Sequence, residues 1–107
     1  MKPFHNKDMD FLFQGILTLQ NKEECYAFFE DICTIKELQA MAQRFWVAAQ
    51  LRDNKNYQEI QASTGASSAT ISRVNKCLLY GDGGYATALQ RLEDAKEKTD
   101  GSDAEER

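Results

Sequence analysis

The side chains best suited to recognise another molecule lie between residues 67 and 76. If this stretch is helical, Ile71 and Val74 share one face. The opposite face then carries small, hydroxyl-bearing and basic side chains: Ala69, Ser72, Arg73 and Lys76. Small side chains permit close approach to a DNA groove, hydroxyl groups hydrogen-bond base edges or phosphates, and cations bind the backbone or guanine. The stretch therefore predicts a DNA-reading helix, with an ordinary solvated helix face as the alternative.

Two short helices joined by a tight turn would position this face. Residues 57–64 predict the first helix, Gly65-Ala66 the turn and residues 67–80 the second helix, a pattern typical of a helix-turn-helix. Gly65 permits a positive φ at the turn, and Ser67 can cap the second helix. Ile60 would join Ile71 and Val74 in a small core between the two helices, which disfavours the solvated-face alternative.

The rest of the chain predicts further helices and an all-α fold. Apolar residues recur at helical spacing in four segments, 8–19, 21–33, 34–52 and 85–95. Asn21 with Glu24 resembles an N-cap, and Thr34 with Glu37 forms a capping box. The glycine-rich stretch 81–84 would end the second helix of the helix-turn-helix.

The first predicted helix is apolar nearly all round, because Phe11 and Leu19 fall outside its main apolar stripe. So small a chain has too little surface of its own to cover both sides. A second subunit is the simplest cover, which predicts a homodimer, and Trp46 is expected to pack at its interface.

Length and composition predict one small cytoplasmic domain. The chain has 107 residues, of which 42% are hydrophobic and 28% charged. No apolar run approaches the roughly 20 residues that span a bilayer, and no signal sequence is recognisable, so no membrane association is expected.

No cofactor, metal or catalytic activity is expected. Cys25, Cys33 and Cys77 form no Cys-x-x-Cys pair, so they are predicted to be buried free thiols rather than a zinc site or a disulfide framework. No nucleophile with a base, paired acid and base, or phosphate loop is recognisable.

The formal net charge of −4 is unevenly distributed. Residues 93–107 hold seven acidic and three basic side chains and so account for all of it, and residues 99–107 are expected to form a disordered acidic tail. Residues 34–80 hold six basic and three acidic side chains, a net charge of +3. Because a local excess of cations attracts phosphate, DNA is not excluded, although the affinity per monomer should be modest.

Three motifs resemble the Trp-repressor superfamily and, within it, the YerC/YecD branch. They are Cys33-Thr34-Ile35-Lys36-Glu37-Leu38-Gln39-Ala40-Met41-Ala42-Gln43-Arg44, Gly65-Ala66-Ser67-Ser68-Ala69-Thr70-Ile71-Ser72-Arg73-Val74-Asn75-Lys76, and Tyr80-Gly81-Asp82-Gly83-Gly84-Tyr85. The resemblance covers residues 8–92. It implies a Trp-repressor-like domain over residues 1–98, with the helix-turn-helix at about 57–80. The domain would form an intertwined homodimer that binds a palindromic operator in double-stranded DNA.

The resemblance also implies which residues contact DNA. Ser68, Ala69 and Ser72 match the base-reading positions, and Arg73 lies close to the backbone. Gln58 and Gln61 match positions that are basic in the tryptophan-responsive repressor, so phosphate attraction should be weaker here. The predicted DNA-binding set is Gln58, Gln61, Ser67, Ser68, Ala69, Ser72, Arg73 and Lys76.

A ligand pocket is the second implied site. Thr34, Arg44 and Arg73 match the residues that hold tryptophan in the family. However, Val74 replaces the glycine against which the ligand lies, and its side chain would project about two carbons into that space. Tryptophan is therefore not expected as a corepressor, and another small-molecule effector is left open.

These observations predict a sequence-specific DNA-binding transcriptional regulator, most simply a repressor. The alternative is a protein-interaction module that keeps the helix-turn-helix scaffold but binds little DNA. The low basic excess favours the alternative, and the small, polar reading face disfavours it. DNA binding must release counterions, so a strong salt dependence would distinguish the two.

Overall fold

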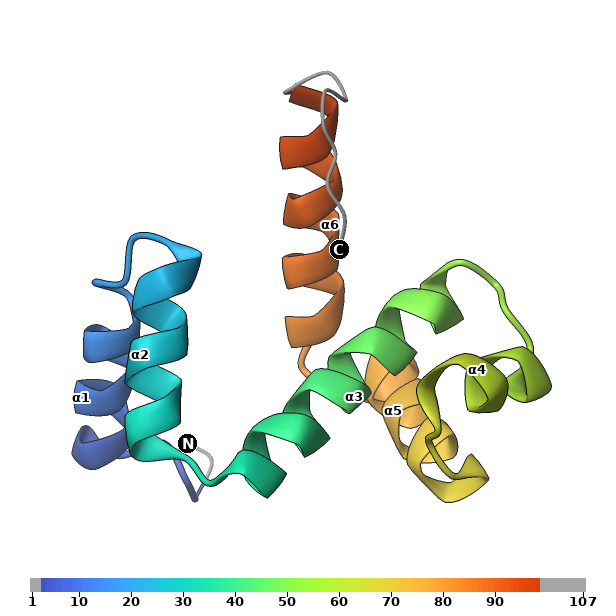
Figure 1. Ribbon diagram of the computed structural model, residues 1–107, viewed down its shortest axis with the longest axis horizontal. Coiled ribbons are helices and arrows are strands. Elements are labelled where there is room, and N and C mark those ends of the chain that lie inside the picture. The colour runs from blue at the N-terminus through green and yellow to red at the C-terminus, as the bar shows by residue number, and fades with distance from the viewer. Residues whose placement is uncertain (1–2, 99–107) are drawn as a thin grey trace. The chain divides into compact units, whose positions relative to one another are not determined.

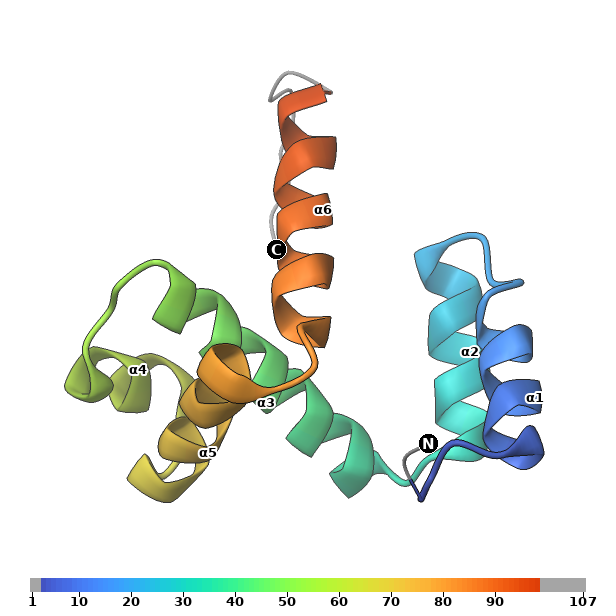
Figure 2. The ribbon, with the colours of Figure 1, turned by 180° about the vertical axis from the view of Figure 1, so that it is seen from behind.

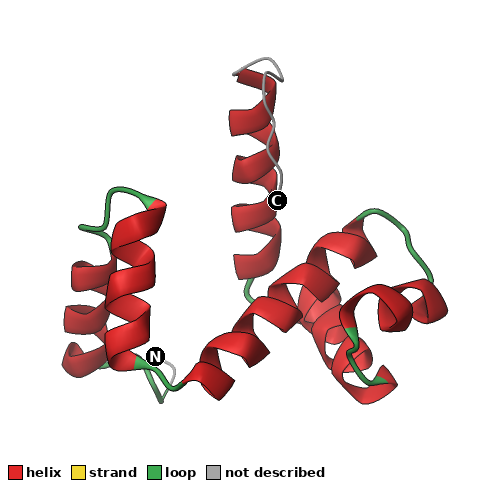
Figure 3. Ribbon diagram, in the orientation of Figure 1, coloured by secondary structure: helices red, strands yellow, loops and turns green. Residues whose placement is uncertain are grey.

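The structure, a computed structural model that describes residues 3–98, consists of helices joined by short turns, and no strand occurs in this part of the chain (Figures 1 and 3). In chain order the helices are α1 (Lys7–Ile16), α2 (Lys22–Ile32), α3 (Ile35–Arg52), α4 (Tyr57–Thr64), α5 (Ser68–Tyr80) and α6 (Gly84–Lys98). The prediction of an all-α fold is confirmed. The predicted acidic tail, residues 99–107, lies outside the described residues.

Side-chain caps begin α2 and α3 where the sequence predicts them. The Asn21 Oδ1 atom accepts a hydrogen bond from the Glu24 N–H at 2.9 Å. At α3 the Thr34 hydroxyl accepts from the Glu37 N–H at 3.1 Å, and the Glu37 carboxylate accepts from the Thr34 N–H at 2.8 Å. Each bond satisfies a backbone donor that has no partner within the helix. Both predicted helix starts are confirmed.

The end of α1 differs from the prediction. The α-helix ends at Ile16 rather than at Leu19. The N–H groups of Thr18 and Leu19 donate to carbonyls only three residues back, those of Gly15 and Ile16, each at 3.1 Å. The Thr18 hydroxyl also donates to the Gly15 carbonyl at 2.7 Å. Such bonds tighten a final turn, and glycine is a weak helix former, so the regular helix stops early.

The chain divides into two compact units, one up to Leu38 and one from Gln39 onward. In the first unit, α1 and α2 contain no fully buried residue. Phe11 is 77% exposed and Phe13 is 46% exposed, and they lie on opposite sides of α1 because two helical residues advance about 200°. The two-sided apolar character of α1 is confirmed, whereas one domain over residues 1–98 stays a prediction.

The second unit has a small apolar core beneath the helix-turn-helix. Both views show α4 and α5 lying beside α3 (Figures 1 and 2). The predicted core residues Ile60, Ile71 and Val74 are at most 1% exposed, so this prediction is confirmed. Alanine and valine side chains complete the buried cluster: Val47, Ala48 and Ala66.

The helix α6 is attached to the same unit through its first half. Tyr85 stacks on Phe45 of α3, with ring centroids 6.4 Å apart and an interplanar angle of 25°. The Arg52 guanidinium donates to the Ala86 carbonyl at 3.5 Å and to the Gln90 side-chain oxygen at 3.1 Å. The carboxyl-terminal part of α3 therefore holds both the helix-turn-helix and α6.

The cysteines are free, as predicted, but the expected burial is wrong for two of them. Cys33 is partly buried, whereas Cys25 and Cys77 are exposed, because nothing in the described chain covers the faces of α2 and α5 that carry them. Within residues 3–98, no group of three or more His, Cys, Asp and Glu side chains is placed to hold a metal ion. None of the described helices is both long and apolar enough to cross a membrane.

Candidate DNA-binding site

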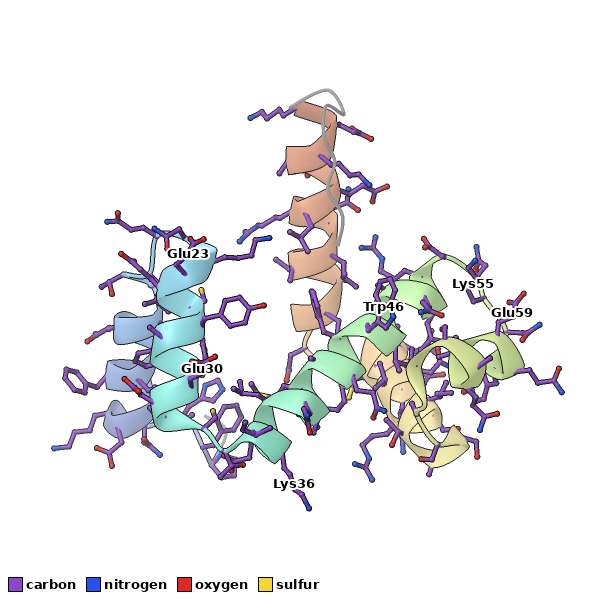
Figure 4. The ribbon with its side chains drawn as sticks, in the orientation of Figure 1. Glu23, Glu30, Lys36, Trp46, Lys55 and Glu59 are labelled. Carbon is purple, nitrogen blue, oxygen red and sulfur yellow. The ribbon has the colours of Figure 1, made fainter. Side chains whose placement is uncertain are left out.

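A reciprocal capping box begins α4. The Asn56 Oδ1 atom accepts from the Glu59 N–H, and the Glu59 carboxylate accepts from the Asn56 N–H, both at 2.9 Å. Glu59 lies on α4 and Lys55 on the segment before it (Figure 4). The box was not predicted, although an Asn followed three residues later by Glu is its sequence signature. It holds the Glu59 carboxylate at a helix N-terminus, where the helix dipole favours negative charge.

The turn between α4 and α5 depends on Gly65. This residue has φ 75° and ψ 4°, the left-handed conformation predicted for it, and its N–H donates to the Gln61 carbonyl at 2.9 Å. Ala66, which follows, is buried. The Ser67 hydroxyl then accepts from the Thr70 N–H at 3.1 Å and so caps α5, as predicted. The turn therefore fixes where α5 begins.

The two faces of α5 differ as the sequence predicts. Ile71 is fully buried and Val74 is 1% exposed. The residues predicted to read DNA are all exposed: Ser68, Ala69, Ser72, Arg73 and Lys76. One side of α5 thus anchors the helix. The other side presents two hydroxyl groups and two cations among small side chains. Contact of this face with DNA stays a prediction.

The helix α4 carries the other two predicted DNA-binding residues, both with amide side chains. Gln58 and Gln61 are both exposed, and residues three apart share one side of a helix. Between residues 55 and 76 the chain holds three basic side chains and one acidic one, a net charge of +2. The site is therefore rich in hydrogen-bonding groups and only mildly cationic.

The structure places the predicted ligand-pocket residues on different elements. The Val74 side chain is packed in the core with Ile60 and Ile71. Arg44 is half-buried on α3 and Arg73 is exposed on α5. Thr34 caps α3 and belongs to the first unit. Neither of the two cavities described in the second unit is lined by any of these residues.

A groove of about 1010 Å³ lies elsewhere, between α3, α6 and the end of α4. Its apolar lining comes from α3 and α6: Ala42, Phe45, Trp46, Ala49, Leu89 and Leu92. Charged side chains also line it: Arg52, Asp53, Glu93 and Lys96. Trp46 projects from α3 and is 41% exposed (Figure 4). The groove was not predicted, because it depends on how α6 packs against α3.

Two glutamines of α3 hold the end of α4, and neither was predicted to matter. The Gln43 amide donates to the Thr64 carbonyl at 3.2 Å, and the Gln50 side-chain oxygen accepts from the Ser63 hydroxyl at 2.8 Å. Gln50 is a buried polar residue with only 7% of its surface exposed. The sequence gives one signal for both: polar side chains on the α3 face that also carries the buried Val47.

Known proteins are similar to this chain in sequence and architecture. The Trp repressor protein family matches residues 7–93. Uncharacterized protein YerC of Bacillus subtilis (strain 168) is 51% identical over 90 residues, covering 84% of this chain and 86% of YerC. The crystal structure of a TrpR-like protein from Eubacterium eligens ATCC 27750 has a TM-score of 0.81 at 48% identity, over 83% of this chain and 92% of that chain. A solved Staphylococcus aureus structure also has a TM-score of 0.81, at 44% identity over 83% of this chain and 89% of its own.

Proposed function

This chain belongs to the Trp repressor protein family, as its resemblance to the YerC-type branch implied, and on that premise we propose that it is a sequence-specific DNA-binding transcriptional regulator. It acts in the cytoplasm as a repressor and binds as a homodimer. Each subunit places α5 in the major groove of one half of a palindromic operator. The half-site centres are about one helical turn, roughly 34–36 Å, apart. No catalytic step belongs to this function.

The exposed face of α5 is the observation that carries the proposal. Ser68 and Ser72 present hydroxyl groups that can donate to or accept from base edges, and Ala69 between them leaves room for close approach. Arg73 and Lys76 supply cations for the phosphates on either side of the groove. The buried residues Ile71 and Val74 hold the helix from behind, so the outer side chains need not serve the core.

The homodimer is supported by the apolar surface that one chain leaves exposed. In the second unit, Trp46 is 41% exposed and Leu92 is 58% exposed, and both line the groove between α3 and α6. In the first unit, Phe11 and Leu17 are 77% and 83% exposed. Exposed apolar side chains that line one groove, as Trp46 and Leu92 do, mark an interaction site. A second copy would bury it and set two α5 helices at a fixed separation.

Operator binding by this regulator does not require tryptophan. The Val74 side chain is packed in the core, and the family resemblance matches Val74 to the glycine against which the family's ligand lies. A ligand there would have to displace a packed side chain. Displacing it costs free energy, because protein interiors are close-packed. We therefore propose that α5 is held in its binding position by Val74 itself.

One observation favours the alternative of a protein-interaction module. The site between residues 55 and 76 has a net charge of only +2, and Gln58 and Gln61 stand where the tryptophan-responsive repressor is basic. A protein-binding surface would need no counterion release. Weak binding to every duplex, with little salt dependence, would support this alternative.

Selection from a pool of random duplexes tests the proposed function. The purified protein is incubated with the pool at fixed moderate salt, with and without L-tryptophan, and the bound fraction is sequenced. Enrichment of the same palindrome in both conditions is the expected result. Enrichment only with tryptophan would show that the pocket tolerates Val74, and enrichment in neither condition would favour the interaction module.

A further inference from the structure

We propose that Gln43 and Gln50 are positioning residues that fix the helix-turn-helix on α3 and so determine which operator spacing the protein accepts. The inference rests on the proposed function, because spacing has meaning only if two α5 helices bind one duplex. It concerns residues on the inner side of the helix-turn-helix, away from the predicted DNA-binding face.

The two glutamines reach the same end of α4 from different points on α3. They are seven residues apart in the sequence, which in a helix places them on one face about 10.5 Å apart along its axis. Gln43 donates to the Thr64 carbonyl at 3.2 Å, and Gln50 accepts from the Ser63 hydroxyl at 2.8 Å. Two separated points on α3 thus converge on adjacent residues in the last turn of α4.

The Gln43 bond satisfies a carbonyl at the carboxyl end of α4, where helix carbonyls have no partner within the helix. Thr64 is also held on its other side: its hydroxyl donates to the Ile60 carbonyl at 2.7 Å and accepts from the Ala66 N–H at 3.0 Å. Ala66 precedes the residue that caps α5. A movement of the Gln43 side chain would therefore move Thr64 and Ala66, and with them the start of α5.

The apolar core alone would not set the angle between the helix-turn-helix and α3. Val47 lies on α3 between the two glutamines and is fully buried beside Ile60 and Ile71. Apolar burial is non-directional, so it favours contact between α3 and the helix-turn-helix at several small rotations. Hydrogen bonds weaken steeply away from their preferred distance and angle. The two glutamine bonds therefore select one rotation among those that the core would accept.

The rotation matters because α3, Gln43 included, also lines the groove in which we propose that the second copy sits; Ser63 does not line this groove. The orientation of the helix-turn-helix on α3 then sets the separation and relative angle of the two α5 helices. Moving the half-sites by one base pair shifts one of them by about 3.4 Å and turns it by about 34°. A firmly held helix-turn-helix rejects that change, whereas a loosely held one accepts it.

The test measures discrimination between spacings with full-length protein. The duplex selected from the random pool is compared with duplexes whose half-sites are moved together or apart by one and two base pairs. The variants are Gln43→Met, Gln50→Met and the double variant, since Met matches Gln in length but forms no such bond. Gln39→Met, an exposed position on the same helix, is the matched control.

The ratio of Kd on a shifted duplex to Kd on the selected duplex is the readout. Each single variant should lower this ratio about fivefold, the loss expected for one net hydrogen bond, and the double variant should lower it further. The salt slope should stay unchanged, because no phosphate-binding side chain is altered. Gln39→Met should behave as the wild type. A uniform loss of affinity at all spacings, with the ratio unchanged, would overturn the inference.

Ser63→Ala provides a second, milder test if a methionine variant does not fold. Ser63 is exposed, so replacing it by alanine removes the hydrogen bond to Gln50 without creating a cavity in the core. It should lower the spacing ratio as Gln50→Met does, and in Gln43→Met the Ala66 N–H should exchange faster with solvent while α6 amides are unaffected. A wild-type ratio and wild-type exchange would overturn the inference. A wild type that selects no duplex would instead refute the proposed function on which it rests.

Discussion

Replacing Val74 by alanine tests whether this side chain supports the reading helix from behind. Val74 is 1% exposed and packs with Ile60 and Ile71, so the change removes two buried carbons. The lost transfer free energy is about 1.6 kcal/mol. The cavity left behind raises the expected loss in the free energy of unfolding to about 2–3 kcal/mol. For a domain of this size that is a fall in Tm of roughly 10–20 °C.

Urea unfolding followed by circular dichroism measures this loss, with all proteins at one concentration because the stability of a dimer depends on it. Leu79→Ala is the matched control: Leu79 lies on the same helix but is 64% exposed, so its loss should change the free energy of unfolding by less than about 0.5 kcal/mol. An equally small change for Val74→Ala would refute the packing of α5 on the core, and with it the argument that Val74 replaces a ligand.

Four further results are expected. Lys76→Ala should weaken binding to all duplexes alike and lower the salt slope by about one; a loss confined to one sequence would contradict its phosphate role. Gly65→Ala should lower the free energy of unfolding by about 1–2 kcal/mol in thermal melts, because alanine is strained at the φ of 75° found there; unchanged stability would contradict this left-handed conformation. Leu92→Asp should shift the protein to monomer in sedimentation equilibrium, and a persistent dimer would exclude the groove as the interface. L-tryptophan should leave the wild-type Tm unchanged, whereas a rise would indicate a pocket.

Helix starts and the turn were predictable because their causes are local. The Thr34 and Glu37 side chains bond backbone groups only three residues away, and Gly65 is the one residue in its turn that takes a positive φ without strain. The opposite faces of α5 also follow from spacing alone. These features need no knowledge of how the helices pack.

Most of the features that were missed depend on packing between helices. A glutamine in an apolar register gives no sign of its partner, so Gln43 and Gln50 could not be assigned to the end of α4 from the sequence. The groove beside Trp46 likewise depends on where α6 rests against α3. The exposed Cys77 thiol shows the converse error, since composition statistics say that cysteines are buried but not whether a given helix face is covered.

The end of α1 was missed for a different reason. Leu17 and Leu19 continue the apolar pattern, which predicts helix, but the hydroxyl of Thr18 competes for the Gly15 carbonyl. The periodicity of apolar residues indicates where apolar side chains lie, but it does not show which backbone hydrogen bonds form. The same pattern nonetheless predicted correctly that α1 is apolar on two sides.

Binding of the selected duplex by Ser72→Glu tests whether α5 reads the major groove. Ser72 is exposed on α5, so a carboxylate there would face the bases and phosphates without disturbing the core. Thr87→Glu, which adds the same charge at an exposed position of α6, is the control. We expect Ser72→Glu to lose more than about 100-fold in affinity, because like charges in an interface cost several kcal/mol, while its Tm and the affinity of Thr87→Glu stay at the wild-type level. Affinity of Ser72→Glu within about threefold of the wild type would contradict the placement of α5 in the major groove.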